Sequence, residues 1–429
     1  MTGRHSDTIF ALSSGSPPAA IAIVRISGPA AGEAAERLAG SLPPARTASL
    51  RTIRHPVTGE ELDRGILLWF PGPATSTGED LAELHLHGGR SVVAAVSETI
   101  AELESLRAAE PGEFTRRAFE NGRIDLAEAE GLSDLLQAET QSQRRAALAL
   151  AGGALSRKVA EWERQLLVLS AQVEAVLDFS DEGDVAEELR AEWHEGLTSL
   201  LREVEALLAQ PAAERLRDGL RVVIAGPPNA GKSSLLNYLV GREAAITSPL
   251  PGTTRDVIEA PVAIRGVPFL LSDTAGLRES DDAVEAVGVD RARLSIEAAD
   301  LILWLGSPSE APFQAIIVET RADLGRITTM GVDHHVSTLT GAGVQELVGA
   351  MVSRARHLLP VEGEVALNER HRSALSDCVQ HLRHALSDGD LLLIAEDLRL
   401  GRRALDSVTG RSDVENMLDA LFGGLCIGK

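Results

Sequence analysis

The sequence predicts a mixed fold in which an α/β part is combined with an all-α part. Short apolar runs alternate with turns and with helical spacing over residues 1–120 and 218–356, whereas residues 126–208 carry almost no strand signal. A length of 429 residues is enough for two or three domains that each bury a core. We therefore expect separate α/β and helical domains.

The first 120 residues predict an α/β domain. The apolar runs 21–26 and 65–70 have the composition of strands, and each ends at a turn that contains Gly and Pro. Residues 31–38 and 92–106 have apolar side chains at helical spacing. Strands and helices that alternate in this way pack as layers around one core.

Helical segments lie on both sides of the second α/β region. Leucine and valine recur near i, i+3 and i+4 over residues 126–208, with an acidic break at 178–184 that favours a solvated turn over a cation site. Residues 210–213 resemble a linker. The later segments with helical spacing are 375–386, 391–405 and 414–421. Because each stretch alone is thin for a core, we expect them to pair as one split helical domain around an inserted domain.

The composition limits the classes of function. Hydrophobic residues make up 44% and charged residues 24% of the chain, as in ordinary globular proteins. The formal net charge of −22 argues against a large basic surface for nucleic acid, so any RNA contact must come from local patches or from a partner. Two cysteines far apart in sequence form no disulfide framework, which fits a cytoplasmic location. We expect no membrane span and no signal peptide.

Residues 226–233 match the phosphate-binding P-loop pattern, and their context agrees with it. The apolar run 221–225 predicts a strand before the loop, and residues 234–239 predict a helix after it. The glycines of the pattern permit a turn that points backbone N–H groups at phosphate oxygens. Lys232 reaches the β- and γ-phosphates, and the Ser233 hydroxyl ligates Mg²⁺. The inserted domain is therefore expected to be a Ras-like P-loop domain with a central, mostly parallel sheet.

Two downstream segments complete the predicted phosphate site. Residues 252–256 lie in a polar, Pro-flanked segment, where a threonine, assigned as Thr254, completes the Mg²⁺ coordination and senses the γ-phosphate. Apolar residues 264–271 predict a hairpin that ends at Asp273, whose carboxylate reaches Mg²⁺ through water. The backbone N–H of Gly276 then contacts the γ-phosphate.

A later strand and loop predict that the base is guanine. Residues 316–318 form a predicted strand that ends just before Asp323, in a segment where GTPases usually carry Asn-Lys-x-Asp. The Asp323 carboxylate accepts two hydrogen bonds from guanine that adenine does not donate. Thr320 and Arg321 replace the usual Asn and Lys. Residues 336–339, which include Ser337, Thr338 and Leu339, can serve as the second base-contacting loop.

The hydrolytic machinery departs from the Ras-like pattern at Leu277. Ras-like GTPases place a water-orienting glutamine there, so another residue must orient the water, on this chain or on a second subunit. Asn229 in the P-loop is a candidate ligand for a monovalent cation beside the β- and γ-phosphates. Such a cation supplies positive charge to the phosphates, as an arginine finger does in other GTPases. Alternatively, Asn229 only stabilises the turn, and the spacing does not decide between the two interpretations.

Further sequence blocks are distributed over the whole chain. They are Asp7-Thr-Ile, Ile23-Val-Arg25-Ile-Ser-Gly28-Pro, Phe70-Pro-Gly-Pro, Thr77-Gly78-Glu79-Asp80, Glu83-Leu-His85-Leu-His87-Gly-Gly, Pro111-Gly-Glu-Phe114, Arg117-Ala-Phe, Asn121-Gly-Arg-Ile-Asp125-Leu and Cys426-Ile-Gly-Lys429. With the P-loop, they resemble the MnmE (TrmE) family of tRNA-modification GTPases over the full length.

The resemblance implies an N-terminal folate-binding domain, a homodimer formed through that domain, and K⁺-dependent GTP hydrolysis when two G domains pair across the dimer. It also implies a heterotetramer or larger complex with the FAD-dependent partner MnmG, through which tRNA is reached. Together the two proteins install a carboxymethylaminomethyl or aminomethyl group at C5 of the wobble uridine of certain tRNAs. The one-carbon unit comes from 5-formyl- or 5,10-methylene-tetrahydrofolate.

The resemblance also assigns roles by position. Folate contacts fall on Arg25, Glu83, Arg123 and Lys429, and K⁺ ligands on Asn229, Ser248, Leu250 and Thr253. Glu285 matches the residue that positions the attacking water, and Cys426 matches a functional cysteine, so Glu285, Asn229 and Cys426 are the expected catalytic residues. The expected GTP-binding residues are Asn229, Ala230, Gly231, Lys232, Ser233, Ser234, Ser248, Thr253, Thr254, Asp273, Thr274, Ala275, Gly276, Asp323, Ser337, Thr338 and Leu339. The expected Mg²⁺ ligands are Ser233 and Thr254.

Two alternatives stay open at this point. His85 and His87 share a face of a predicted strand, but no Cys or third His is near in sequence, so packing or lining of the folate pocket is favoured over a metal pair. The alternative function is a regulatory or ribosome-assembly GTPase switch that does no modification chemistry. The N-terminal blocks and Cys426 argue against it, because a pure switch needs neither.

Overall fold

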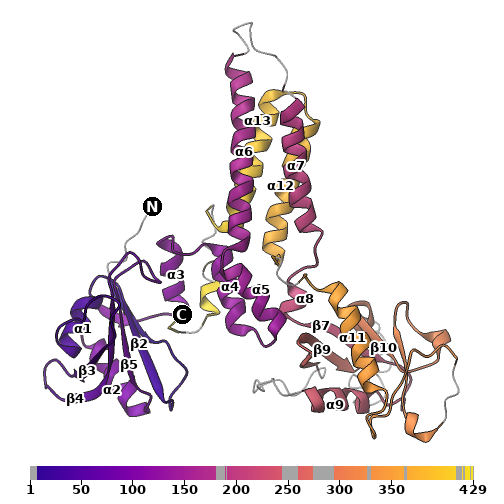
Figure 1. Cartoon of the computed structure of the whole chain (residues 1–429), viewed down its shortest axis with the longest axis horizontal. Coiled ribbons are helices and arrows are strands. Elements are labelled where there is room, and N and C mark those ends of the chain that lie inside the picture. The colour runs from indigo at the N-terminus through magenta and orange to yellow at the C-terminus, as the bar shows by residue number, and fades with distance from the viewer. Residues whose placement is uncertain are drawn as a thin grey trace, which may run out of the picture. The chain divides into compact units, whose positions relative to one another are not determined.

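The computed structural model describes residues 7–179, 189, 191–243, 259–273, 294–325, 330–361, 365–411, 418, 421–425 and 427–428. The chain divides into two units. The first is Met1–Glu130 with Thr409–Lys429, and the second is Gly131–Val408. Each unit is described by itself below (Figure 1).

A six-stranded sheet forms the centre of the first unit (Figure 1). In the order β3-β4-β5-β2-β1-β6, all neighbours pair antiparallel except β1 and β6, which pair parallel. The strands are β1 Thr8–Leu12, β2 Ile21–Ser27, β3 Ser49–Arg54, β4 Glu61–Phe70, β5 Leu81–His87 and β6 Leu106–Ala108. The expected α/β domain is therefore confirmed, including the strands predicted at 21–26 and 65–70.

The two faces of this sheet differ in chemistry. Helices α1 (Ala31–Ala39) and α2 (Arg90–Ala101) form one core with Val24 of β2 and Leu84 of β5. Side chains alternate along a strand, so Arg25 and its neighbours on β5 face the other side. The sheet thus buries one face under two helices and presents charged side chains on the other.

The predicted helix over 92–106 is too long. Helix α2 ends at Ala101, and Leu106 begins β6, which pairs with β1. Ser105 takes a left-handed backbone conformation with φ 66°, which an α-helix does not continue through. Pairing with a distant strand therefore overrides the local helical spacing.

The C-terminal residues belong to the first unit. Leu418 and Phe422 pack with Leu126 in a small hydrophobic cluster. Ile427 forms an isolated antiparallel bridge with Pro111. A Cβ on Gly428 would lie 2.3 Å from the carbonyl oxygen of Leu12, so the chain approaches β1 too closely for any side chain.

Helices before and after the nucleotide segment pair with each other, which confirms the split helical domain. Figure 1 shows α6, α7, α12 and α13 side by side, and both α6 and α12 contact α7. Arg372 of α12 donates to the carbonyl oxygens of Leu208 and Gln210 at 2.7 and 3.0 Å. The helices are α4 Leu126–Gln137, α5 Gln141–Ala151, α6 Ala154–Phe179, α7 Ala191–Leu208, α12 Glu369–Ser387 and α13 Leu391–Thr409.

The inserted domain is built on a second six-stranded sheet in the order β12-β11-β10-β7-β9-β8. All neighbours pair parallel except β8, which pairs antiparallel with β9. The strands are β7 Leu220–Ala225, β8 Glu259–Ile264, β9 Val267–Asp273, β10 Leu301–Trp304, β11 Ile316–Glu319 and β12 His334–His335; the helices are α8 Glu214–Arg217, α9 Lys232–Glu243 and α11 Val344–Leu358. The predicted mostly parallel sheet is confirmed.

Among the described residues, none of the helices combines the length and apolar character that crossing a bilayer requires. The division of the chain into an N-terminal domain (1–120), a first helical part (121–215), a G domain (216–360) and a second helical part (361–429) stays a prediction.

Candidate functional site

The P-loop leaves the central strand of the second sheet. Residues 222–225 of β7 are buried, and Gly226 follows with φ 145°. A Cβ at Gly226 would lie 2.6 Å from the carbonyl oxygen of Leu305 on the neighbouring strand end. Gly231, with φ 95°, then opens α9. Both glycines are required, because a side chain at either position is strained by the backbone conformation.

Two side chains at the start of α9 are positioned for phosphate and metal. Lys232 is 7% exposed, and its Nζ donates to the carbonyl oxygens of Gly226 and Pro227 at 3.1 and 2.9 Å. Ser233 Oγ donates to Asp273 Oδ2 at 2.6 Å, which brings the end of β9 to the loop. A hydroxyl and a carboxylate this close are the oxygen donors that Mg²⁺ prefers, so these residues fit the ion.

The base-recognition loop is attached to the P-loop by residues that the sequence analysis treated only as departures. Thr320 Oγ1 donates to the carbonyl oxygen of Ala230 at 2.7 Å, and Arg321 Nη2 donates to that of Asn229 at 3.2 Å. Thr320 also lies against Gly231, where a Cβ would be 3.1 Å from its hydroxyl. The side chains at 320 and 321 thus fix the phosphate loop relative to the base loop.

The predicted guanine-reading residues come together beside this attachment. Asp323 Oδ1 accepts a hydrogen bond of 2.6 Å from Ser337 Oγ, and Ser337 is fully buried. Thr338 and Leu339 continue the same loop, and Leu339 is 84% exposed. The bond to Ser337 orients the carboxylate on which the guanine prediction rests.

Asn229 adopts a left-handed conformation with φ 62° within the P-loop. Asparagine tolerates this region better than other non-glycine residues, so the turn alone explains the residue type. Its backbone carbonyl accepts from Arg321, which leaves the side-chain amide outside that bond. Both interpretations, turn residue and cation ligand, are compatible with this geometry.

A second group of predicted residues meets on the face of the N-terminal sheet opposite α1 and α2, where Phe114 of α3 (Glu113–Glu120) also packs. Arg25 Nη2 lies 3.0 Å from Glu83 Oε1, and the Arg25 guanidinium lies 5.7 Å from the centre of the Phe114 ring. His85 Nε2 lies 3.3 Å from the other oxygen of Glu83. Arg123 lies on a separate loop, where its Nε donates to the carbonyl oxygen of Thr75 at 3.1 Å.

His85 and His87 do not share a ligand position. His85 contacts Glu83, whereas His87 Nδ1 lies 2.8 Å from Asp63 Oδ1 on β4. The alternative of a metal pair at these two histidines gains no support, because each imidazole is paired with a different carboxylate.

A buried ionic network in the first unit was not anticipated. Arg117 is fully buried and lies 3.1 Å from Asp7, 3.2 Å from Glu79 and 3.0 Å from Glu113. Arg107 also pairs with Glu113 and Asp7. Four of these residues, Asp7, Glu79, Glu113 and Arg117, lie in the blocks on which the family resemblance rests. Charged positions within those blocks were therefore the available signal.

The network lowers the pKa of the Glu113 carboxyl below its ordinary value of 4.5. Burial alone raises this pKa, but hydrogen bonds from Arg107, from the Glu110 backbone and from Arg117 outweigh that effect. The pKa of Asp7 is lowered for the same reasons: burial raises it, and Arg107 and Arg117 more than compensate. Both groups are therefore carboxylates at neutral pH.

Several expected site residues lie outside the described residues. They are Ser248, Leu250, Thr253, Thr254, Thr274, Ala275, Gly276, Glu285, Cys426 and Lys429. Their assignments, and those of Leu277 and the segment 252–256, stay predictions.

The parallel sheet, the P-loop with its lysine and serine, and the paired Asp323 and Ser337 define a P-loop GTP-binding protein. The family model of the GTP-binding protein TrmE N-terminus matches residues 8–123, and that of the MnmE helical domain matches residues 126–426. The chain belongs to the MnmE family of tRNA modification GTPases.

Curated relatives agree over nearly the whole chain. The tRNA modification GTPase MnmE of Rhizorhabdus wittichii is 57% identical over 427 residues, which cover 99% of this chain and 97% of that protein. The MnmE of Novosphingobium aromaticivorans is 53% identical and covers 99% of this chain and 100% of that protein. The chain is therefore a GTP hydrolase that acts in tRNA modification.

Among solved structures, the G domain of the T. maritima FeoB iron transporter is 26% identical to this chain. The match covers 32% of this chain and 98% of that domain, with a TM-score of 0.23. The TM-score is too low for this likeness to support a conclusion.

Proposed function

We propose that this chain is a K⁺-dependent GTPase that works as a homodimer with an FAD-dependent MnmG-type partner in the cytoplasm. The pair installs a carboxymethylaminomethyl or aminomethyl group at C5 of the wobble uridine of certain tRNAs. The one-carbon unit comes from a tetrahydrofolate derivative. The observation that carries the proposal is the presence of two separate candidate sites in one chain: the P-loop with Asn229, and the Arg25–Glu83 pair in the other unit.

The GTP site works by binding and orienting the triphosphate. Backbone N–H groups of the P-loop and the Lys232 ammonium bind the β- and γ-phosphate oxygens, and Asp323 reads the guanine edge. Ser233 and Thr254 hold Mg²⁺. The Asp273 carboxylate supports Ser233, because Asp273 Oδ2 accepts a hydrogen bond of 2.6 Å from Ser233 Oγ. The ion neutralises charge on the phosphates.

K⁺ dependence is assigned to the P-loop asparagine. Asn229 holds K⁺ together with Ser248, Leu250 and Thr253, and the ion supplies positive charge where other GTPases use an arginine finger. Glu285 orients the attacking water. It takes the role of the glutamine that Ras-like GTPases carry at the position of Leu277. Pairing of two G domains completes this arrangement.

A glycine substitution tests the role of Asn229 without changing the turn. Glycine adopts φ 62° freely, so Asn229→Gly keeps the loop conformation and removes only the amide. We expect wild-type GTP turnover to rise at least tenfold when Na⁺ is replaced by K⁺, and the variant to show the same low rate in both salts with unchanged GTP binding. Equal wild-type rates in K⁺ and Na⁺ at saturating Mg²⁺ would contradict K⁺ dependence.

Folate binding is assigned to the charged face of the N-terminal sheet. Glu83 is held from two sides by Arg25 and His85, so its carboxylate is fixed before a ligand arrives. A fixed carboxylate next to a guanidinium and the Phe114 ring offers hydrogen bonding and an aromatic surface to a pterin. Arg123 and Lys429 add positive charge for the glutamate tail of folate.

Calorimetry of the full chain with 5-formyltetrahydrofolate tests this assignment. Glu83→Gln removes the charge at the centre of the face and is expected to weaken binding by at least tenfold. Glu102→Gln is the matched control, because it removes an exposed histidine–glutamate pair of 3.2 Å elsewhere in the same unit. The absence of heat with wild-type protein would remove folate from the proposal.

Analysis of wobble uridine separates the proposal from a GTPase switch. A deletion strain is expected to lack the C5 substituent, wild-type chain to restore it, and Cys426→Ser to restore it poorly despite normal GTP turnover. Normal modification in the deletion strain would favour the switch.

A further inference from the structure

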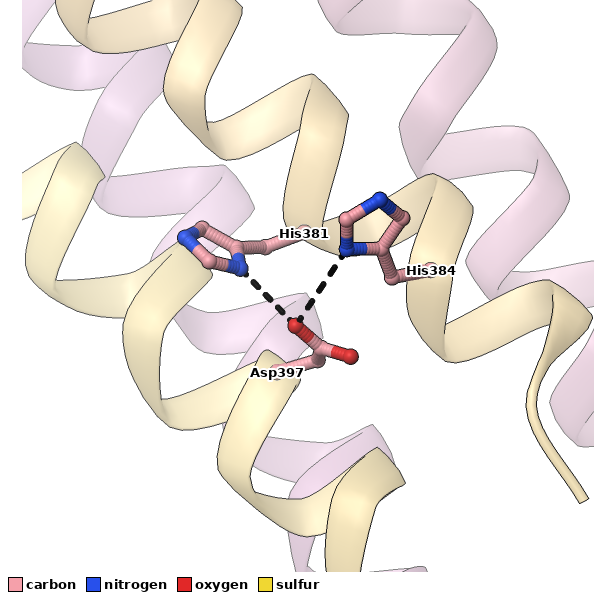
Figure 2. A group of neighbouring side chains, drawn as sticks. All are labelled: His381, His384 and Asp397. Carbon is pink, nitrogen blue, oxygen red and sulfur yellow. Dashed lines mark hydrogen bonds and ion pairs between the residues drawn. The ribbon is translucent and has the colours of Figure 1, made fainter. Parts of the chain in front are cut away.

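Three potential metal ligands meet on two helices of the split helical domain. His381 and His384 lie three residues apart on α12, so both project from one face of the helix. Asp397 lies on α13 opposite them. Figure 2 shows the two imidazole rings and the carboxylate pointing toward one another.

The distances place the three groups around a common point. Asp397 Oδ1 lies 2.8 Å from His381 Nδ1 and 3.9 Å from His384 Nδ1. One ligand atom from each residue lies within 4.8 Å of the others. In the part of the chain that the structure describes, this is the one group of three or more His, Cys, Asp or Glu side chains with such spacing.

We propose that His381, His384 and Asp397 bind a divalent transition-metal ion of the Zn²⁺ class. Two imidazole nitrogens and one carboxylate oxygen form a common donor set for Zn²⁺. Bonds of about 2.0–2.2 Å place the donors on a tetrahedral ion roughly 3.3–3.5 Å apart. The observed separations of 2.8 and 3.9 Å fall on either side of that value, so small side-chain rotations admit the ion. Water or a ligand from outside completes the coordination.

The surroundings favour a cation. Nearby arginines are paired with carboxylates: Arg399 with Glu396 at 2.7 Å and Arg383 with Glu205 at 2.6 Å. The charges of these two guanidinium groups are therefore compensated by their own carboxylates, and the chain carries a net charge of −22. The His384 side chain is 57% exposed, which leaves the group accessible from solvent.

The simpler interpretation is that His381 and Asp397 only hydrogen-bond the two helices together. His87 and Asp63 make a pair of the same 2.8 Å length in the other unit, where no third ligand among the described residues is grouped with them. The feature that distinguishes the α12–α13 group is His384. An exposed imidazole 3.9 Å from the same oxygen adds little to helix packing but supplies the third donor.

Binding of Zn²⁺ and Co²⁺ to the full chain tests the proposal. Protein stripped of metal and loaded with Mg²⁺ and GDP, so that the P-loop takes no probe, is titrated with Zn²⁺ by calorimetry. Bound Co²⁺ is followed by its visible absorption. A site of nitrogen and oxygen donors gives these bands without the near-ultraviolet charge transfer that a cysteine ligand produces. Cys378 does not compete, because burial raises the pKa of its thiol to about 12.

His384→Gln is the decisive variant, because it leaves the His381–Asp397 hydrogen bond in place. We expect wild-type protein to bind one Zn²⁺ at this site, and His384→Gln and Asp397→Asn each to weaken binding by at least tenfold. Asp63→Asn, which breaks the control pair with His87, is expected to bind like wild type. Equal Zn²⁺ binding by wild type and His384→Gln, or a Co²⁺ spectrum dominated by thiolate, would overturn the proposal.

Discussion

At the scale of single residues, the structure gives functions to positions that the sequence pattern treats as exceptions. Thr320 and Arg321 replace the usual Asn and Lys of the base loop, and both donate to carbonyl oxygens of the P-loop. The two replacing residues therefore hold the base loop against the phosphate loop by hydrogen bonds.

Removal of the Thr320 hydroxyl is expected to weaken GTP binding. Thr320→Val keeps the shape but leaves the Ala230 carbonyl without its 2.7 Å partner. The loss of about 1.4 kcal/mol corresponds to roughly tenfold in Kd for GTP. Fluorescent-nucleotide titration measures the change, and Thr320→Ser, which keeps the hydroxyl, is the control. Wild-type affinity in the valine variant would show that the bond does not support the site.

Arg117 is expected to be the most sensitive charged residue of the first unit. Arg117→Met removes the fully buried cation that pairs with Glu79 and Glu113. Glu113 keeps Arg107, but Glu79 loses its guanidinium partner, and the expected cost is about 3–5 kcal/mol. Arg116→Met is the matched control, because Arg116 makes an exposed pair with Glu120, and such pairs contribute about 0–1 kcal/mol. Hydrogen exchange of the amides of β1 and of α3 (Glu113–Glu120) measures both changes, and similar protection in the two variants would contradict the prediction.

At the scale of elements, one carboxylate joins β6 to α3 (Glu113–Glu120). Glu113 accepts from Arg107 on β6, from the Glu110 backbone in the connection, and from Arg117 one turn later in α3. The start of this helix is therefore fixed by the charged form of Glu113.

The stability of this element is expected to depend on pH. The pKa of Glu113 is lower in the folded chain than its ordinary value of 4.5, so the unfolded chain binds the proton more readily. The stabilisation is fully present above about pH 5 and is lost as pH falls through the folded pKa. Hydrogen exchange of α3 at pH 6 and pH 4 measures it. The Glu113→Gln variant is expected to protect α3 less than wild type at pH 6, and its protection is expected to change less between pH 6 and pH 4. An equal change in protection in the variant and in wild type would contradict this account.

At the scale of the whole molecule, the charge predicts how tRNA is approached. A net charge of −22 opposes the phosphate backbone, so we expect the chain alone to bind tRNA weakly and the complex with its FAD-dependent partner to bind it more tightly. Filter binding at moderate salt compares the two. Tight binding by the chain alone would place the RNA surface on this protein.

The sequence predicted features that depend on neighbours along the chain. The P-loop, the strand before it, the helix after it and the helical spacing of α12 and α13 are local signals, and the structure confirms these elements. The Arg117–Asp7 pair and the Asp397–His381 pair join separate elements, so no local period indicates them. The end of α2 was missed for the same reason, since β6 forms only because β1 lies beside it.

The antiparallel bridge between Ile427 and Pro111 has a consequence for how the protein is made. Ribosomes deliver residues in order, and domains generally fold as they emerge, at about 5–20 residues per second of synthesis. The first unit must therefore wait, on the order of tens of seconds, until residues 131–408 have been translated before Phe422 and Gly428 reach it. A nascent chain that stalls within the helical or GTPase segment would leave the cluster around Leu126 open. Completion of the N-terminal unit thus reports that translation of the intervening chain has finished.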